Sequence, residues 1–176
     1  MLDLVRTANK EVYGLSNPLI VDAFIEIPKG SQNKYEFDKE QGVFRLDRVL
    51  YSPFHYPTEY GYINGTLAED GDPLDILVLT TLPTFPGCVI ESRVIGVLIM
   101  ADDKGQDEKL LGVPTQDPRF RDVHGLDDVP EHTLKEIAHF FQVYKDLENK
   151  ETSIKGWQRV EEADRILSES KARYRE

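Results

Sequence analysis

A short acidic segment carries the residues whose types and spacing could do chemistry. Asp70, Asp72 and Asp75 place three carboxylates within six residues, with Gly71 and Pro73 between them. Glycine permits a sharp turn and proline fixes a backbone angle, so we predict a rigid loop. Several carboxylates aimed at one point suit a hard divalent cation such as Mg²⁺, which takes oxygen ligands in an octahedron. A solvated turn is the alternative, because Asp and Gly are ordinary turn residues.

The strands around this loop must position its side chains. The apolar run from Ile76 to Leu79 directly after Asp75 predicts a buried strand. Residues 20–27 predict another strand, which ends before Pro28 and contains Glu26. A charged residue on an alternating strand can simply face solvent, so Glu26 stays open as a site residue at this level.

Residues 34–38 and 43–50 are predicted to pair as a hairpin across a polar turn. The alternation of side chains places Arg48 on the same face as Leu46 and Leu50, which predicts a core-facing arginine. Because burying an unpaired arginine is costly, Arg48 should have an anionic partner. The alternative is a strand end at which Arg48 already reaches water.

Residues 101–113 predict a second acidic hairpin, with Gly105 in its turn. This arrangement would bring Asp102 and Asp107 to opposite sides of one loop, close enough to share a cation. Asp107 and Lys109 would then share a face. An exposed polar hairpin tip is the alternative.

Two helices are predicted in the C-terminal half. Apolar residues at helical spacing predict one helix that begins at Pro130 and closes at Tyr144 and Lys145, with Leu147 at the end of its buried stripe. Residues 160–174 predict a C-terminal amphipathic helix whose charges form a solvated face. Before both helices, a long β-rich run up to residue 100 is predicted to bend near a glycine.

Length and composition predict one domain spanning residues 1–176, in which residues 1–18 are only weakly patterned. The net charge of −11 disfavours binding to a nucleic-acid backbone, which needs clustered Lys and Arg. No apolar run has the length of a membrane span, and the first residues lack a signal-peptide pattern. With a single cysteine, Cys88, these features predict a cytoplasmic protein.

Several familiar motifs are excluded. The acidic segment is not an EF-hand, because Pro73 occupies its fourth position and Thr81 stands where the twelfth position needs Glu. The chain has neither a P-loop nor a Gly-x-Gly-x-x-Gly sequence, and no His-Glu-x-x-His. One cysteine and scattered histidines disfavour zinc. Hard-cation chemistry on carboxylates is what remains.

In combination, these segments resemble the soluble family I inorganic pyrophosphatases. The resemblance runs from about residue 20 to about residue 157, and its most specific part is the Asp-Gly-Asp-Pro-x-Asp sequence at residues 70–75. The other segments that carry it are Ile25-Glu26-Ile27-Pro28, Lys34-Tyr35-Glu36, Leu46-Asp47-Arg48, Tyr56-Pro57, Tyr60-Gly61-Tyr62-Ile63, residues 102–109, His139-Phe140-Phe141 and Tyr144-Lys145.

The resemblance implies an α+β, mainly β fold: an OB-fold-like closed β-barrel with flanking α-helices. It implies hydrolysis of inorganic pyrophosphate to two orthophosphates by a multi-metal Mg²⁺ site, with a metal-activated water as nucleophile and Asp72 as general base. By the same analogy the chain would form a homo-oligomer, typically a hexamer for short chains. Neither a nucleic acid nor a membrane is expected as a partner.

The resemblance also implies a role for each site residue. The implied metal ligands are Asp70, Asp75, Asp107 and Asp102, with Glu26 acting through metal-bound water and Glu36 supporting the site from its rim. The implied substrate-binding residues are Lys34, Arg48, Tyr60, Tyr144 and Lys145, with Lys109 as a nearby basic residue. Tyr56 matches a tyrosine at the edge of the site.

The charge of this residue set supports a multi-metal site. Its seven carboxylates against four basic side chains leave a formal charge of −3. Pyrophosphate adds about −3 to −4, so roughly three or four Mg²⁺ would neutralise the sum. Two rival functions are an OB-type nucleic-acid-binding module, which the negative charge opposes, and a non-catalytic protein that binds cations or polyphosphate. The second is opposed by Asp72 occurring together with the basic residues and Tyr144.

Overall fold

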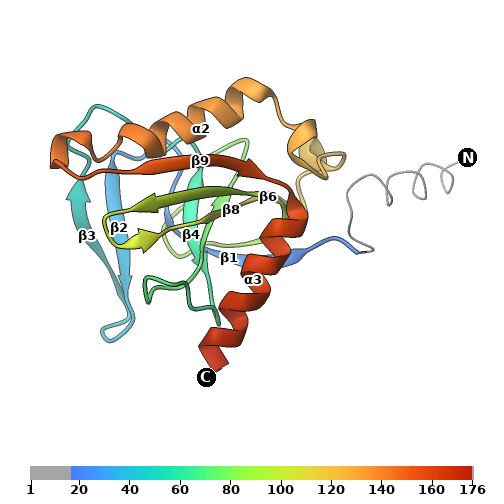
Figure 1. Ribbon diagram of the computed structural model, residues 1–176, viewed down its shortest axis with the longest axis horizontal. Helices are drawn as coiled ribbons and strands as arrows, with labels where there is room; N and C mark the ends of the chain where they lie inside the picture. Colours follow the sequence, from blue (N-terminus) through green and yellow to red (C-terminus); the bar gives the residue numbers. More distant parts are fainter. Residues whose placement is uncertain (1–16, 176) are drawn as a thin grey trace, which may run out of the picture.

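The computed structural model describes residues 17–175, so the prediction for residues 1–18 falls almost entirely outside the described residues. The strands are β1 (Ile20–Ile27), β2 (Asn33–Asp38), β3 (Val43–Val49), β4 (Glu59–Ile63), β5 (Asp75–Val78), β6 (Val89–Asp102), β7 (Gly105–Gln106), β8 (Lys109–Pro114) and β9 (Ser153–Gln158). The helices are α2 (Glu131–Val143) and α3 (Val160–Arg175), with 3₁₀ turns η1 (Pro118–Phe120), η2 (Leu126–Asp128) and η3 (Asp146–Glu148). Figure 1 shows the strands at the centre and both helices outside them.

Five strands close into a barrel. They pair in the order β1-β4-β5-β8-β6, and β6 pairs with β1 again to complete the circuit. Every neighbouring pair is antiparallel except β5 and β8, which run parallel. This confirms the predicted mainly β fold with a closed barrel and flanking helices.

Barrel closure depends on a close approach between β1 and β4. Gly61 lies opposite Ile25 in the register of this pair. A Cβ atom built at Gly61 would lie only 2.0 Å from the carbonyl oxygen of Phe24. A larger residue at position 61 would therefore push β4 away from β1, and β4 leads directly into the acidic loop.

The long strand β6 ties the barrel to the rest of the chain. It pairs with β1, β8, β7 and β9, and its register shifts between Val94 and Gly96, where the sequence predicts a bend. β9 was not predicted from the sequence. It extends the sheet along the second half of β6 and lies beneath α2 in Figure 1.

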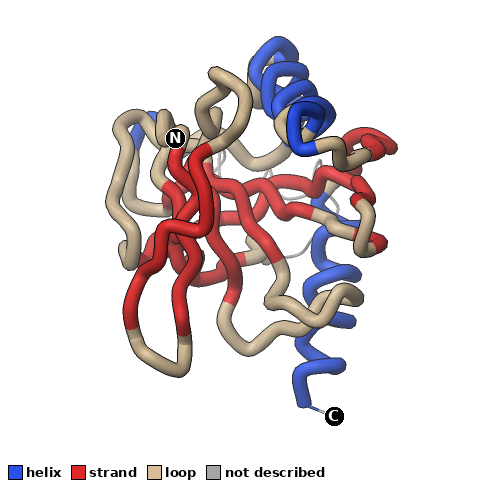
Figure 2. Tube along the Cα trace, turned by 90° about the vertical axis from the view of Figure 1, so that its left-hand side faces the viewer, coloured by secondary structure: helices blue, strands red, loops and turns tan. Residues whose placement is uncertain are grey.

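The core lies on two sides of the sheet, and β5 shows both. Leu77 packs in one cluster with Ile137 and Phe141 of α2. Ile76 and Val78 pack in the other cluster with Leu167 of α3. Alternate side chains of a strand point to opposite faces, so a strand covered on both faces becomes a continuous apolar run. Figure 2 shows the two helices against different parts of the barrel. None of the helices in residues 17–175 combines the length and the apolar character that a membrane span requires.

Two predictions about burial were wrong. Leu46 was predicted to face the core, but it is 55% exposed because β2 and β3 form a separate two-stranded sheet beside the barrel. Leu147 was predicted to end the buried stripe of the helix, but it is 61% exposed. The helix α2 ends at Val143, and Leu147 belongs to the short turn η3 that follows.

Candidate active site

The candidate site lies where four segments meet: the acid loop (residues 64–74) between β4 and β5, the hairpin β6–β7, the start of β8 and the end of α2. Asp75 is the first residue of β5, and Lys109 is the first residue of β8. The parallel pairing of these strands puts Asp75 directly opposite Lys109. The fold therefore brings together residues that are 34 positions apart.

Lys109 is the centre of the site. Its side chain is 1% exposed, and its Nζ atom donates to Oδ2 of Asp75 and to Oδ1 of Asp107, at 2.7 Å each. The hydroxyl of Tyr60 donates to the same Oδ2 atom of Asp75 at 2.5 Å. The rings of Tyr60 and Phe141 flank the ammonium, with centroids 5.3 Å from Nζ. Two carboxylates thus converge on a single buried cation.

Burial and neighbouring charges have opposing effects on the pKa values of Lys109 and Asp107. Burial alone would lower the pKa of Lys109, but the charges of Asp75 and Asp107 outweigh it and raise the pKa. Burial is the main cause that raises the pKa of Asp107, and the like charges of Asp75 and Asp102 add to it against the opposing effect of Lys109. The ammonium of Lys109 therefore opposes the effect of burial only in part, and the pKa of Asp107 stays above its ordinary value.

The hairpin β6–β7 meets the end of α2 through a second ion pair. Lys145 Nζ donates to Oδ2 of Asp102 at 2.8 Å, and the backbone amide of Lys104 donates to Oδ1 of Asp102, also at 2.8 Å. Burial would raise the pKa of Asp102, but these hydrogen bonds and the charge of Lys145 lower it below its ordinary value. Tyr144 lies beside this pair, its ring centroid 5.3 Å from Lys145 Nζ.

The acid loop turns as the sequence predicts. Gly71 has a φ of +91°, which favours glycine, and the amide of Asp72 donates to Oδ1 of Asp70 at 3.0 Å. Burial raises the pKa of Asp70, and Asp72 and Asp107 add to this effect by charge repulsion. The side chain of Asp72 is exposed, and within residues 17–175 its carboxylate has no hydrogen-bond or ion-pair partner. It is therefore free to accept a proton or to bind a ligand.

Arg48 has the anionic partners that its position demands, and both belong to the protein. Its Nε donates to Oε1 of Glu148 at 2.9 Å, and its Nη1 donates to Oδ2 of Asp47 at 2.5 Å. Burial would lower the pKa of Arg48, but the hydrogen bonds and charges of these two carboxylates raise it. Sequence reasoning did not identify either carboxylate as a partner of Arg48. Asp47 is a neighbour of Arg48, whereas Glu148 is 100 positions away and carries no local signal.

The β2–β3 hairpin supplies the remaining polar residues. Lys34 contacts the carboxylate of Glu36 and lies 3.3 Å from Oδ2 of Asp47. Oε1 of Glu26 accepts a hydrogen bond from the amide of Phe37 at 2.8 Å. Burial raises the pKa of Glu26 to about 7, even though this hydrogen bond opposes the shift.

Tyr56 packs beneath the polar residues. It is 2% exposed, and its ring lies 5.6 Å from that of Tyr60 and 4.9 Å from that of Phe140. Burial raises its pKa well above the ordinary tyrosine value. In this structure Tyr56 contributes to the floor of the site through packing.

The structure thus gathers the predicted residues into one polar region. Some of them are in direct contact, and others are close enough for the charge of one to shift the pKa of another. Direct contacts join Asp75, Asp107, Lys109 and Tyr60, and a second contact joins Asp102 to Lys145. Lys34 and Arg48 meet at Asp47 on the rim. Across the described part of the chain, no three His, Cys, Asp or Glu side chains already surround a single point as metal ligands. Two of the carboxylates instead close on the ammonium of Lys109.

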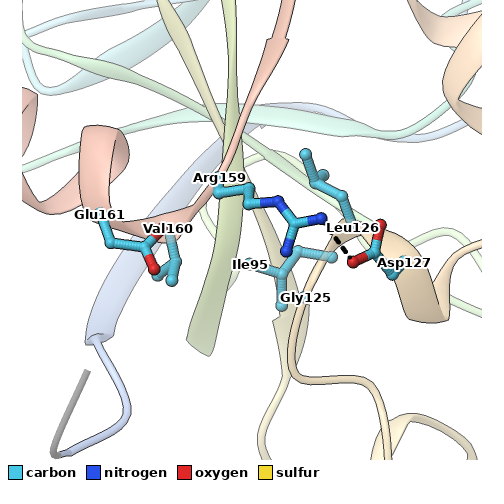
Figure 3. A pocket seen from close by; sticks show the side chains of 7 residues that line it. All are labelled: Ile95, Gly125, Leu126, Asp127, Arg159, Val160 and Glu161. Atoms are coloured by element: carbon cyan, nitrogen blue, oxygen red, sulfur yellow. Dashed lines mark ion pairs between the residues drawn. The ribbon is translucent and has the colours of Figure 1, made fainter. Parts of the chain in front are cut away.

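A separate hollow lies at the start of α3, and none of the site residues lines it (Figure 3). Its volume of about 10 Å³ is on the scale of one water molecule. Arg159 and Asp127 form an exposed ion pair of 2.9 Å across it. Its size excludes it as the site of a larger ligand.

Comparisons with known proteins identify the family and match the fold. A family model described as "Inorganic pyrophosphatase" matches residues 23–175. The inorganic pyrophosphatase of Geobacillus stearothermophilus is 64% identical over 157 residues, which cover 89% of this chain and 95% of the relative. The crystal structure of the Thermus thermophilus inorganic pyrophosphatase superposes with a TM-score of 0.87 at 46% identity, covering 93% of this chain and 96% of that one. A structure of the Helicobacter pylori inorganic pyrophosphatase also has a TM-score of 0.87, at 44% identity, with 89% and 94% covered.

Proposed function

Because the chain belongs to the inorganic pyrophosphatase family, we propose that it hydrolyses inorganic pyrophosphate to two orthophosphates at the site around Lys109. The observation that carries this proposal is the convergence of Asp75 and Asp107 on one buried cation, with Arg48, Lys34 and Lys145 around them. Phosphoryl transfer requires little covalent chemistry from a protein. It requires positioning and neutralised charge, and these residues supply both.

The residues present fit a Mg²⁺ site in donor type and in charge. The candidate ligands Asp70, Asp75, Asp102 and Asp107 all offer carboxylate oxygens, which hard cations prefer. Asp75 and Asp107 together carry two negative charges against the one ammonium of Lys109 that they share. Asp47 and Glu148 add two more carboxylates to the rim. When bound, Mg²⁺ would neutralise charge on the phosphates and lower the pKa of a coordinated water.

The roles of the protein side chains follow from their surroundings. Asp72 is proposed as the general base, because its exposed carboxylate is not held by an ion pair or hydrogen bond within residues 17–175. Arg48, Lys34 and Lys145 are proposed to bind phosphate oxygens, since charge-assisted hydrogen bonds are the strong ones. Tyr60 and Lys109 hold the carboxylate of Asp75 in place.

A homo-oligomer, typically a hexamer, is proposed from the family resemblance. The organisation of residues 1–176 as one domain is proposed as well. It is supported by the closed barrel and by α2 and α3, which pack on that barrel.

The first test is phosphate release from pyrophosphate, measured with Mg²⁺ and with excess chelator. Release should require Mg²⁺, and ATP as a control substrate should give little phosphate by comparison. Folded protein that releases no phosphate from pyrophosphate with Mg²⁺ would contradict the proposal, and so would equal release from ATP.

Glu148 offers a second test, because its side chain is only 5% exposed and holds Nε of Arg48. Glu148→Ala is expected to raise the KM for pyrophosphate about three- to tenfold with a smaller change in kcat, since the guanidinium loses its orientation. Steady-state kinetics at saturating Mg²⁺ measure the effect. Glu151→Ala, at an exposed position nearby, is the control.

Glu148→Gln separates orientation from charge. Its amide oxygen can still accept the hydrogen bond from Arg48, so this variant should keep a KM close to that of the unmodified protein. If both variants bind pyrophosphate more tightly than the unmodified protein, Glu148 acts by repelling the substrate and its positioning role is wrong.

A further inference from the structure

We propose that the last turn of α3 positions the acid loop, and that Arg173 is a positioning residue for the aspartates of that loop. The inference rests on the proposed function, because it assumes that Asp70 of this loop binds Mg²⁺ and that Asp72 acts as the general base. The charges of α3 were predicted to form only a solvated face. Arg173 does not fit that description, because its guanidinium is half-buried and bound to a loop more than 100 positions earlier.

Both backbone polar groups of Leu67 are bound by α3. The amide of Leu67 donates to the carbonyl oxygen of Ser170 at 2.9 Å, and Nε of Arg173 donates to the carbonyl oxygen of Leu67 at 2.9 Å. Ser170 lies one turn before the last residues of α3, so this bond attaches Leu67 to the C-terminal part of the helix. Nη2 of Arg173 also donates to Oγ of Ser170, which is fully buried, at 3.2 Å. Figure 2 shows a loop of the barrel lying against this end of α3.

The anchored residue is adjacent to the turn that carries the aspartates. The amide of Ala68, next to Leu67, donates to the carbonyl oxygen of Asp72 at 2.7 Å. The amide of Gly71 donates back to the carbonyl oxygen of Ala68 at 3.2 Å. A displacement of Leu67 would therefore move Ala68, and with it the backbone of Asp72 and the side chain of Asp70 that binds to it.

The remaining hydrogen bonds hold the base of the loop rather than its tip. Oγ1 of Thr66 accepts from the amide of Leu74 at 2.9 Å and donates to the carbonyl oxygen of Ile63 at 2.5 Å. These bonds join the two ends of the loop to each other. The attachment to α3 is different, because it connects the loop to an element that is packed on the barrel through its own apolar face.

The helix contains a matched control. Arg165 lies on the same helix, but its guanidinium is exposed and binds Glu162 and Glu169 of α3 itself. Replacing either arginine by methionine removes one charge and keeps a similar helix propensity. The two replacements differ in whether the acid loop loses a hydrogen bond.

The experiment measures Mg²⁺ affinity by calorimetry without substrate, together with the Mg²⁺ dependence of pyrophosphate hydrolysis. Arg173→Met is expected to weaken Mg²⁺ binding about three- to tenfold, below the 10- to 100-fold typical of residues that contact metal ligands directly. A higher Mg²⁺ concentration should restore most of the turnover. The Mg²⁺ affinity of Arg173→Lys should lie between those of Arg173→Met and the unmodified protein, because the lysine ammonium can again donate to Leu67. The Mg²⁺ affinity of Arg165→Met should match that of the unmodified protein.

Unchanged Mg²⁺ affinity in folded Arg173→Met would overturn the inference, as would an equal loss in Arg165→Met. If Arg173→Met does not fold, Arg173→Lys decides: weaker Mg²⁺ binding supports the inference and unaltered binding refutes it. Failure of the proposed function would be distinct, because the unmodified protein itself would then show no Mg²⁺-dependent hydrolysis of pyrophosphate.

Discussion

Replacing Asp72 with asparagine is expected to reduce the turnover of pyrophosphate by about 10²–10⁴-fold, the range typical for loss of a general base. The substitution keeps the size of the side chain. It also leaves intact the backbone bonds of Asp72 to Ala68 and to the carboxylate of Asp70, which set the shape of the turn. Stability and Mg²⁺ affinity should therefore change little. Stopped or continuous phosphate assays, with calorimetric titration of Mg²⁺, measure the two quantities separately.

Asp103→Asn is the control for this variant. Asp103 is also exposed and acidic and lies in the turn between β6 and β7, but no role in the site is proposed for it. It should retain nearly full activity. If Asp72→Asn loses Mg²⁺ affinity in parallel with its turnover, Asp72 is a metal ligand and its assignment as the general base is wrong.

The features that could be predicted from the sequence are those encoded within a few residues. The apolar run after Asp75 predicts a buried strand, and β5 is indeed buried, with core residues on both of its faces. Gly71 and Gly105 predict two turns, and both residues have positive φ angles in the structure. Such signals are local because backbone preference and side-chain alternation depend on near neighbours.

The features that could not be predicted arise from pairing between distant segments. The register that sets Asp75 opposite Lys109 depends on how β5 and β8 align, and alternation within either strand does not specify this. The same applies to the bond between Arg48 and Glu148. The exposure of Leu46 was wrongly predicted for a related reason: a period of two shows which residues share a face, but not whether another element covers that face.

Lys109→Met is expected to have the largest effect on stability, because it removes the buried cation shared by Asp75 and Asp107. Losing one partner of a buried ion pair costs about 3–5 kcal/mol, since the other charges stay buried without compensation. We expect a loss of this size in the free energy of unfolding in chelator at neutral pH, measured by denaturant titration. Lys135→Met, whose exposed ammonium pairs with Glu131 on α2, should stay within about 0.5 kcal/mol of the unmodified protein.

The pH dependence of Lys109→Met follows from the same charges. Without Lys109, the pKa of Asp107 should rise further above its ordinary value, because the ammonium is what opposes the effect of burial. The folded variant would then bind a proton more tightly than the unfolded chain, so its stability should fall as the pH rises from the ordinary Asp pKa through the raised one. In acidic buffer, Lys109→Met should accordingly recover part of the free energy of unfolding that it loses at neutral pH.

Magnesium provides the decisive comparison for Lys109→Met. A cation that binds only the folded state raises the free energy of unfolding, and once its concentration exceeds Kd this gain grows with the logarithm of the concentration. If Asp75 and Asp107 are Mg²⁺ ligands, Mg²⁺ can supply the positive charge that the variant lacks, so the stability gap between variant and unmodified protein should narrow from chelator to Mg²⁺. An equal gap in both buffers would show that Mg²⁺ does not bind these carboxylates. The repulsion between them would then be relieved by protonation alone, and the proposed metal site would have to lie elsewhere.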